Sequence, residues 1–236
     1  LSSRIQAIQG ASLYYTVCAT LEFINVRRLR RVMDLDVLLA AMQQGSKAID
    51  VDAIRRSPTA YWVGTTKTDG TPTLVDAKVA EPDIFAAIRA SMTIPGVSGG
   101  PVLVNGQAFF DGGINPFPIQ EMVRQFQPTD VLVLPNICQR FVDPPRMRVR
   151  DLSALVVLKS GSLALTQRAL TRRVKFHESL EVARALPNVR IGILWPEDLG
   201  IHELTNNPSL LRQGSHDNFV QTVRTFGGNN VPVPLL

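Results

Sequence analysis

The sequence predicts a layered α/β domain with a mixed, largely parallel β-sheet. Two observations predict this class. Short apolar runs, at residues 131–134 and 189–195, alternate with longer segments of helical periodicity, which is typical of strands joined by crossover helices. In addition, no internal repeat, low-complexity stretch or long linker divides the chain, so residues 1–236 are expected to form a single domain.

Helices are predicted at several points in the first third of the chain. Residues 1–24 read as a helical region of mixed quality. Asp34 is suited to cap a helix that Gly45 can end, because apolar residues recur between them at helical spacing, namely Leu35, Leu38, Leu39 and Met42. Asp50 precedes a second, shorter helix, and Pro82 is expected to open a third at its first turn.

Two β-hairpins are predicted between residues 60 and 110. In the first, strands at 60–66 and 73–76 flank the turn residues Asp69-Gly70. In the second, which covers 101–110, the turn is Asn105-Gly106, a pair that readily takes the positive φ angles of a type I′ turn. The second hairpin is what makes the expected sheet mixed.

The second half of the chain continues the alternation. The pattern predicts helices at 119–126, 163–186 and 208–226, and buried strands at 130–134 and 189–195.

Composition restricts the class of protein. The 236 residues are 45% hydrophobic and 19% charged, values that exclude a disordered or collagen-like chain. No apolar run reaches the ~20 residues of a membrane-spanning helix, and no signal peptide is recognisable at the start. Cys18 and Cys138 are widely separated, which indicates a reducing compartment or simple burial, so a cytoplasmic location is expected. The chain starts with Leu1 instead of methionine, which suggests that it begins inside a longer protein.

The net charge of +5 arises from arginine-rich positive charge, with 20 arginines and 5 lysines. The arginines group near residues 27–31, 140–150 and 168–173. Such groups either meet phosphate, as on anionic lipid headgroups, or form ordinary solvated surfaces. Nucleic acid is not an expected partner, because no aromatic residues are interleaved for base stacking and no nucleic-acid motif is present.

Gly96-Val97-Ser98-Gly99-Gly100 matches the G-x-S-x-G pattern of serine hydrolases and allows a triad of Ser98, Asp111 and His216 to be drawn. A nucleophile elbow, however, needs a strand before the serine and a helix after it, whereas here a helix precedes and a hairpin follows. Ser98 is therefore expected to be a loop residue.

No metal or cofactor site is expected. His177, His202 and His216 are scattered, and none has a second histidine, cysteine or carboxylate pair at metal-ligand spacing. No glycine-rich nucleotide-binding motif follows a predicted strand.

Asp111 is the candidate catalytic residue. It ends the second strand of the 101–110 hairpin and is followed by Gly112 and Gly113, which are expected to let the backbone turn sharply and approach whatever Asp111 faces. A simple turn-forming role is the alternative.

The run from Ala90-Ser91-Met92-Thr93-Ile94-Pro95, through the hairpin, to Asp111-Gly112-Gly113 resembles the C-terminal catalytic part of patatin-like lipid acyl hydrolases. The resemblance extends over nearly the whole chain and implies a layered helix/sheet/helix fold. It also implies that Asp111 is the aspartate of a Ser–Asp dyad that hydrolyses lipid esters, with possible peripheral contact to an anionic membrane.

The chain departs from the family pattern in one respect. It contains neither the glycine-rich oxyanion loop nor the G-x-S-x-G elbow that precede this part of the family. We therefore expect an incomplete N-terminal side and no ester hydrolysis by this chain alone. Two alternatives remain open: a non-catalytic patatin-like module that binds lipid surfaces or partners, and a self-contained serine hydrolase that uses Ser98.

Overall fold

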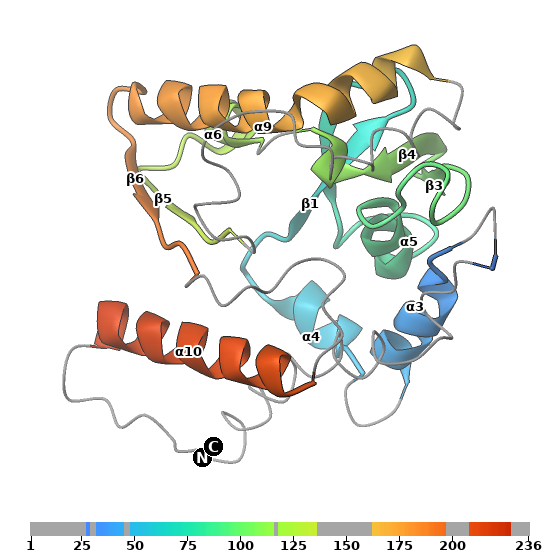
Figure 1. The fold of residues 1–236 in the computed structure, drawn as a ribbon, viewed down its shortest axis with the longest axis horizontal. Helices are drawn as coiled ribbons and strands as arrows, with labels where there is room; N and C mark the ends of the chain where they lie inside the picture. Colours follow the sequence, from blue (N-terminus) through green and yellow to red (C-terminus); the bar gives the residue numbers. More distant parts are fainter. Residues whose placement is uncertain are drawn as a thin grey trace.

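The described part of the chain forms a mixed α/β structure with one four-stranded and one two-stranded sheet (Figure 1). The computed structural model describes residues 27–28, 32–44, 48–115, 118–135, 162–196 and 208–227. The helical region expected over the first two dozen residues, and the expected helix end at Gly45, lie outside the described residues.

The four-stranded sheet is built from the two predicted hairpins. Strands β1 (Trp62–Lys67) and β2 (Pro72–Asp76) form the first, and β3 (Val102–Val104) and β4 (Gln107–Asp111) form the second. The hairpins join through β1 and β4, giving the order β2-β1-β4-β3 with every neighbour antiparallel. The predicted type I′ turn is present between β3 and β4, where Asn105 and Gly106 have φ angles of 51° and 73°.

Three helices lie beside this sheet, and an aspartate caps the N-terminus of each. Helix α3 (Leu35–Gln43) is capped by Asp34, α4 (Val51–Arg56) by Asp50, and α5 (Ile84–Ala90) by Asp83, each through a hydrogen bond from a backbone N–H in the first turn. The expectation that Pro82 opens the third helix is wrong by two residues, because the carboxylate of Asp83 caps the helix and Pro82 precedes the cap.

Helices pack on both faces of the four-stranded sheet because successive residues of β4 point in opposite directions. Phe109 joins the largest core cluster, which contains residues of α3 and α5. Phe110 joins a second cluster with Ile114, Leu165 and Ala169, the last two from the long helix α9 (Leu163–Arg184). The end of β4 therefore lies where α9 covers the sheet.

The two-stranded sheet pairs β5 (Asp130–Val133) with β6 (Arg190–Ile193) in parallel, with α9 as the crossover between them. The helices α6 (Ile119–Phe126) and α9 cover one face through a cluster that contains Ile119, Val131, Val133 and Leu180. Helix α10 (Pro208–Gly227) contacts the end of β6, where Gln221 Nε2 donates to the Trp195 carbonyl at 3.1 Å.

Two expectations about the strands differ from the structure. Three of the four strand pairings in the described residues are antiparallel, so the sheet is not largely parallel there, because both hairpins pair with each other through β1 and β4. The second strand expected to be buried, β6, alternates between exposed and half-buried residues. The β5 strand is also not buried on both faces, because Leu132 is 51% exposed and Leu134, just beyond the strand, is 60% exposed. Although residues 131–134 are all apolar, burial alternates along β5, and only Val131 and Val133 face the helices.

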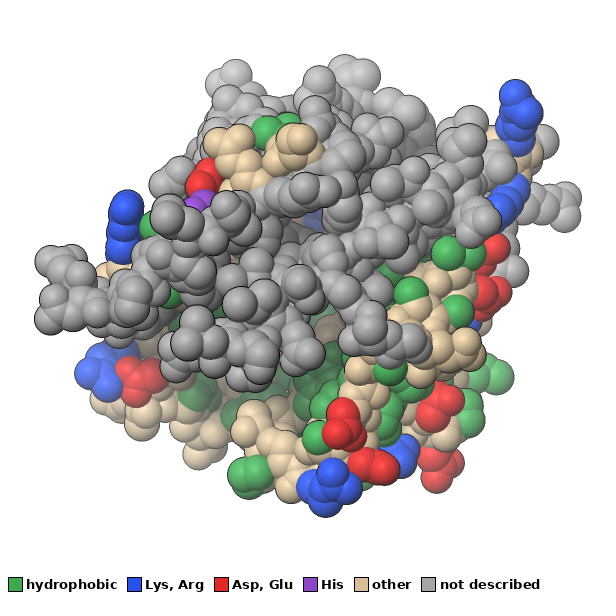
Figure 2. Space-filling model, turned by 90° about the horizontal axis from the view of Figure 1, so that it is seen from below, with side chains coloured by type: hydrophobic (Ala, Val, Ile, Leu, Met, Phe, Trp, Pro, Cys, Tyr) green, Lys and Arg blue, Asp and Glu red, His purple; other side chains and the backbone are tan. Residues whose placement is uncertain are grey.

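The described surface carries charges of both signs. On the face drawn in Figure 2, lysine and arginine side chains lie beside aspartate and glutamate side chains. Arg28 pairs with Asp34 at 3.1 Å, and Arg89 pairs with Asp36, which links α5 to α3. The arginines at residues 30–31 and 140–150 lie outside the described residues. Among the helices of the described segments, none has the length and apolar character needed to cross a bilayer.

Candidate functional site around Asp111

Asp111 lies at the junction of three chain segments. It is the last residue of β4 and pairs with Thr65 of β1, and the short 3₁₀ helix η1 (Gly112–Ile114) begins immediately after it. Its backbone N–H donates to the Thr93 carbonyl at 2.9 Å. Thr93 belongs to the Ala-Ser-Met-Thr-Ile-Pro segment that follows α5, so the two motifs noted in the sequence are hydrogen-bonded neighbours.

The two carboxylate oxygens of Asp111 have different surroundings. Oδ1 accepts a hydrogen bond from the Gly113 N–H at 2.5 Å, which closes a local turn. Oδ2 has no hydrogen-bond partner among the described residues, and the side chain as a whole is partly exposed. One oxygen therefore fixes the orientation of the carboxylate, and the other accepts no hydrogen bond from the described residues.

The surroundings of Asp111 make it a stronger base than an ordinary aspartate. Burial raises its pKa to about 6, and the hydrogen bond from Gly113 and the positive charge of Arg172 lower the pKa only in part. A carboxyl with this pKa is about nine-tenths ionised at pH 7 while still accepting a proton more readily than a carboxylate with a pKa near 4. Its protonation behaviour thus suits a general base near neutral pH.

The two glycines after Asp111 are needed for close approach and not for positive φ angles, which neither has. A Cβ on Gly112 would lie 2.3 Å from the Gly64 carbonyl oxygen of β1. A Cβ on Gly113 would lie 2.9 Å from Asp111 Oδ1. The sequence predicts that these glycines approach whatever Asp111 faces, but the contacts are different: Gly112 approaches the neighbouring strand β1, and Gly113 approaches the carboxylate of Asp111 itself.

Sequence reasoning missed Arg172 and Thr93 as neighbours of Asp111. Arg172 follows the buried residues Leu165 and Ala169 of α9 at helical spacing, which places all three along the side of α9 that faces η1 and β4. The helical spacing of these three residues is visible in the sequence, but the segments against which this side of α9 packs are not. Thr93 had no distinguishing signal beyond its place in the motif.

Ser98 occupies a turn between α5 and β3, as the sequence predicts for a loop residue. Its side chain is buried, and its hydroxyl oxygen accepts a hydrogen bond from the Ile94 N–H at 3.4 Å. No strand leads into this turn and no helix follows it, so the backbone amides of a nucleophile elbow are not formed around Ser98.

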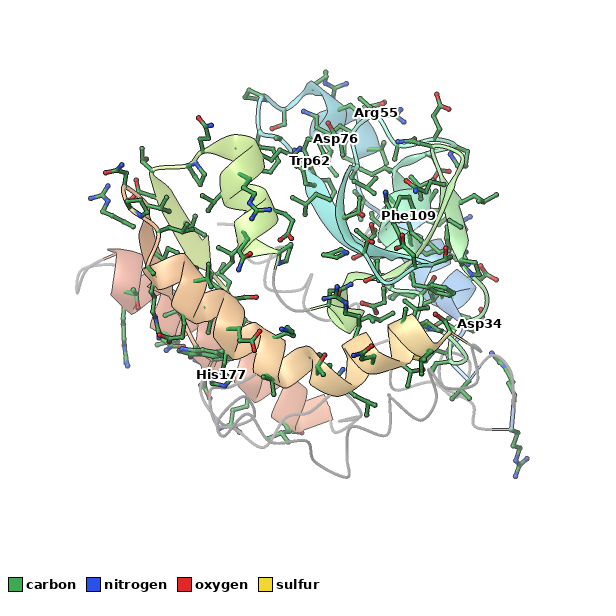
Figure 3. All side chains as sticks on the ribbon, turned by 90° about the horizontal axis from the view of Figure 1, so that it is seen from above. Asp34, Arg55, Trp62, Asp76, Phe109 and His177 are labelled. Atoms are coloured by element: carbon green, nitrogen blue, oxygen red, sulfur yellow. The ribbon has the colours of Figure 1, made fainter. Side chains whose placement is uncertain are left out.

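The histidines do not complete a triad with Asp111 in the described structure. His216 is carried by α10, which Figure 1 shows across the molecule from β4. In Figure 3, His177 on α9 lies well apart from Phe109, which is two residues before Asp111 in β4. His202 lies outside the described residues. The described segments also contain no group of three or more histidine, cysteine or acidic side chains that could hold a metal ion.

No protein-family model matches the chain, and no curated protein matches it. The resemblance to patatin-like hydrolases therefore rests on the residues quoted for it.

Proposed function

We propose that this chain supplies the aspartate of a Ser–Asp dyad in a patatin-like lipid acyl hydrolase, a carboxylic ester hydrolase. In this proposal the chain is the portion of the layered patatin-like fold that follows the oxyanion loop and the elbow serine. Both of those come from a segment outside this chain. The substrate class is a lipid ester, so the proposal includes contact with a membrane surface. The two widely separated cysteines favour the cytoplasmic side.

Asp111 then acts as the general base. The elbow serine hydroxyl attacks the ester carbonyl while Oδ2 of Asp111 takes the hydroxyl proton, and the oxyanion loop holds the developing negative charge. The same carboxyl returns the proton to the leaving alcohol. Water, deprotonated by Asp111, then hydrolyses the acyl-enzyme and regenerates the serine.

One observation carries this proposal: the Asp111 carboxylate is held through Oδ1, its Oδ2 accepts no hydrogen bond from the described residues, and burial raises its pKa to about 6. An aspartate that takes a proton from serine without an intervening histidine needs this added basicity. The hydrogen bond between Asp111 and Thr93 supports the proposal further, because it joins the two sequence motifs on which the resemblance rests.

The proposal is tested by joining the chain to the natural sequence that precedes Leu1 in its own reading frame and measuring ester hydrolysis. Replacing Asp111 by Asn should lower kcat by about 10²–10⁴-fold, because the amide accepts no proton. Asp76→Asn is the matched control, since the Asp76 carboxylate makes the same local bond at the end of β2, from the Lys78 N–H at 2.9 Å. An upstream frame without an elbow serine, or equal turnover in the Asp111 variant, would refute the proposal.

The isolated chain should hydrolyse no p-nitrophenyl ester above background, because the buried hydroxyl of Ser98 has no elbow to present it. A fluorophosphonate probe should accordingly leave Ser98 unlabelled, as judged by mass spectrometry of the digested chain. Labelling of Ser98 that disappears in Ser98→Ala would instead favour the self-contained serine hydrolase.

A further inference from the structure

We propose that Thr66 and Asn115 are positioning residues for Asp111: their side chains form a buried hydrogen-bonded chain that fixes the main chain on which the carboxylate is mounted. The role of these hydrogen bonds in catalysis rests on the proposed function, but their effect on the position of Asp111 can be measured without any substrate.

The chain of hydrogen bonds runs from Asn115, the residue after η1, through Thr66 of β1, to the end of β4. The Thr66 hydroxyl of β1 donates to the Asp111 carbonyl at 2.8 Å. The same hydroxyl oxygen accepts from Asn115 Nδ2 at 2.8 Å, and Nδ2 also donates to the Gly70 carbonyl at 3.3 Å. Thr66 and Asn115 are both buried, so solvent does not compete for these bonds.

The direction of each bond follows from the Gly70 carbonyl, which can only accept. The Asn115 amide must therefore turn its NH₂ group toward both Gly70 and Thr66. Because the Thr66 oxygen receives an N–H from Asn115, its own single proton is left to point at the Asp111 carbonyl. Asn115 thus orients the hydroxyl that holds Asp111.

Asn115 is a costly residue for a purely structural role. Its side-chain oxygen Oδ1 is buried without a hydrogen-bond partner among the described residues, and the residue is only 6% exposed. An unpaired buried acceptor typically costs about 1–3 kcal/mol. Such local costs concentrate at functional sites, and here the benefit is an oriented donor toward Asp111.

Together with the Thr93 carbonyl, this chain accounts for both backbone polar groups of Asp111: the N–H donates to Thr93, and the carbonyl accepts from Thr66. The bond from the Gly113 N–H to Oδ1 is local and moves with the turn. By contrast, two effects on the pKa of the Asp111 carboxyl depend on where the turn is held. One is the desolvation of the carboxyl, and the other is the positive charge of Arg172. Releasing the carbonyl should therefore let the carboxylate move toward water while keeping its local bond.

The test is an NMR titration of the Asp111 carboxyl carbon in the full chain, with variants of two adjacent threonines. Thr66→Val removes the oriented hydroxyl at nearly constant volume. The control is Thr65→Val, because Thr65 is equally buried and its hydroxyl donates to a different carbonyl, that of Thr73, at 3.1 Å. Thr66→Ser keeps the hydroxyl and should restore the wild-type titration.

In Thr66→Val the pKa of Asp111 should fall by about one unit or more, since desolvation is the main cause that raises it. Asn115→Ala should lower it in the same direction by a smaller amount, because the Thr66 hydroxyl then loses its fixed orientation. This second variant decides the question if Thr66→Val does not fold. An unchanged or higher pKa in the folded variants, or an equal fall in Thr65→Val, would overturn the positioning role.

The outcomes separate this inference from the proposed function. A fall in the pKa of Asp111 together with undiminished hydrolysis by Asp111→Asn would keep the positioning role and reject the dyad. Loss of hydrolysis in Asp111→Asn with no change in the titration of Thr66→Val would do the reverse.

Discussion

Replacing Asp111 by Asn should make the folded chain more stable at neutral pH, and the gain should disappear on acidification. The folded pKa of Asp111, about 6, lies above the ordinary value of 3.8. Below pH 4 the carboxyl is protonated in both the folded and the unfolded chain, so folding is not penalised. Between pH 4 and pH 6 the unfolded chain loses this proton first, and the folded chain becomes less stable as the pH rises.

The size of the effect follows from the shift in pKa. Two units correspond to about 3 kcal/mol, and partial exposure of the side chain reduces the expected value to about 1–3 kcal/mol. The difference in unfolding free energy between Asp111→Asn and the wild type should therefore increase by this amount from pH 4 to pH 8. Asparagine can still accept the Gly113 N–H, so the local turn is retained.

The measurement is urea unfolding of both proteins at several pH values, followed by circular dichroism. Asp76→Asn reports what an amide does in the same kind of turn at the end of β2. A stability difference between Asp111→Asn and the wild type that is independent of pH would mean that Asp111 is not desolvated in the folded chain. The basicity on which the proposed function rests would then be lost.

Gly112→Ala should be the most damaging single substitution at the site. The added Cβ would lie 2.3 Å from the carbonyl oxygen of Gly64 and 2.6 Å from its carbonyl carbon. Both atoms belong to the backbone of β1, so no side-chain rotation relieves the contact, and η1 must move away from the strand. We expect a loss of about 3 kcal/mol or more in the free energy of unfolding.

Gly64→Ala is the matched control because it adds a methyl group to the other partner of the same contact. Its Cβ would be 4.0 Å from Pro118 Cγ, which is an ordinary contact. The expected change is within about 1 kcal/mol. Chemical denaturation of both variants gives the comparison, and equal stabilities would show that η1 does not pack against β1 as closely as described.

Local features of the fold were well predicted because neighbouring residues determine them. The Asn105-Gly106 turn and the helix of residues 119–126 appear where the sequence places them, and the 163–186 helix ends two residues early. Asp34 and Asp50 cap their helices, because a capping carboxylate needs only the backbone N–H groups two or three residues ahead. Pro82 was misplaced because the competing cap, Asp83, lies next to it.

The site was predicted only in part. The sequence identified Asp111, Gly112 and Gly113, since a strand that ends in Asp-Gly-Gly is a local pattern. It did not identify Thr66, Asn115, Thr93 or Arg172 as its neighbours. Thr66 lies 45 residues before Asp111 and meets it only because the two hairpins pair through β1 and β4. Nothing in the composition of either hairpin specifies that pairing.

The sequence by itself thus determined the elements and the residue that ends β4, because capping, turn preference and apolar periodicity act over a few residues. Tertiary structure alone decided that the hairpins join into one antiparallel sheet, that α9 covers the end of β4, and that Asp111 is partly desolvated there. The physical reason is that burial depends on which segments distant in the chain exclude water together. A carboxyl therefore acquires its basicity from the fold and not from its sequence neighbours.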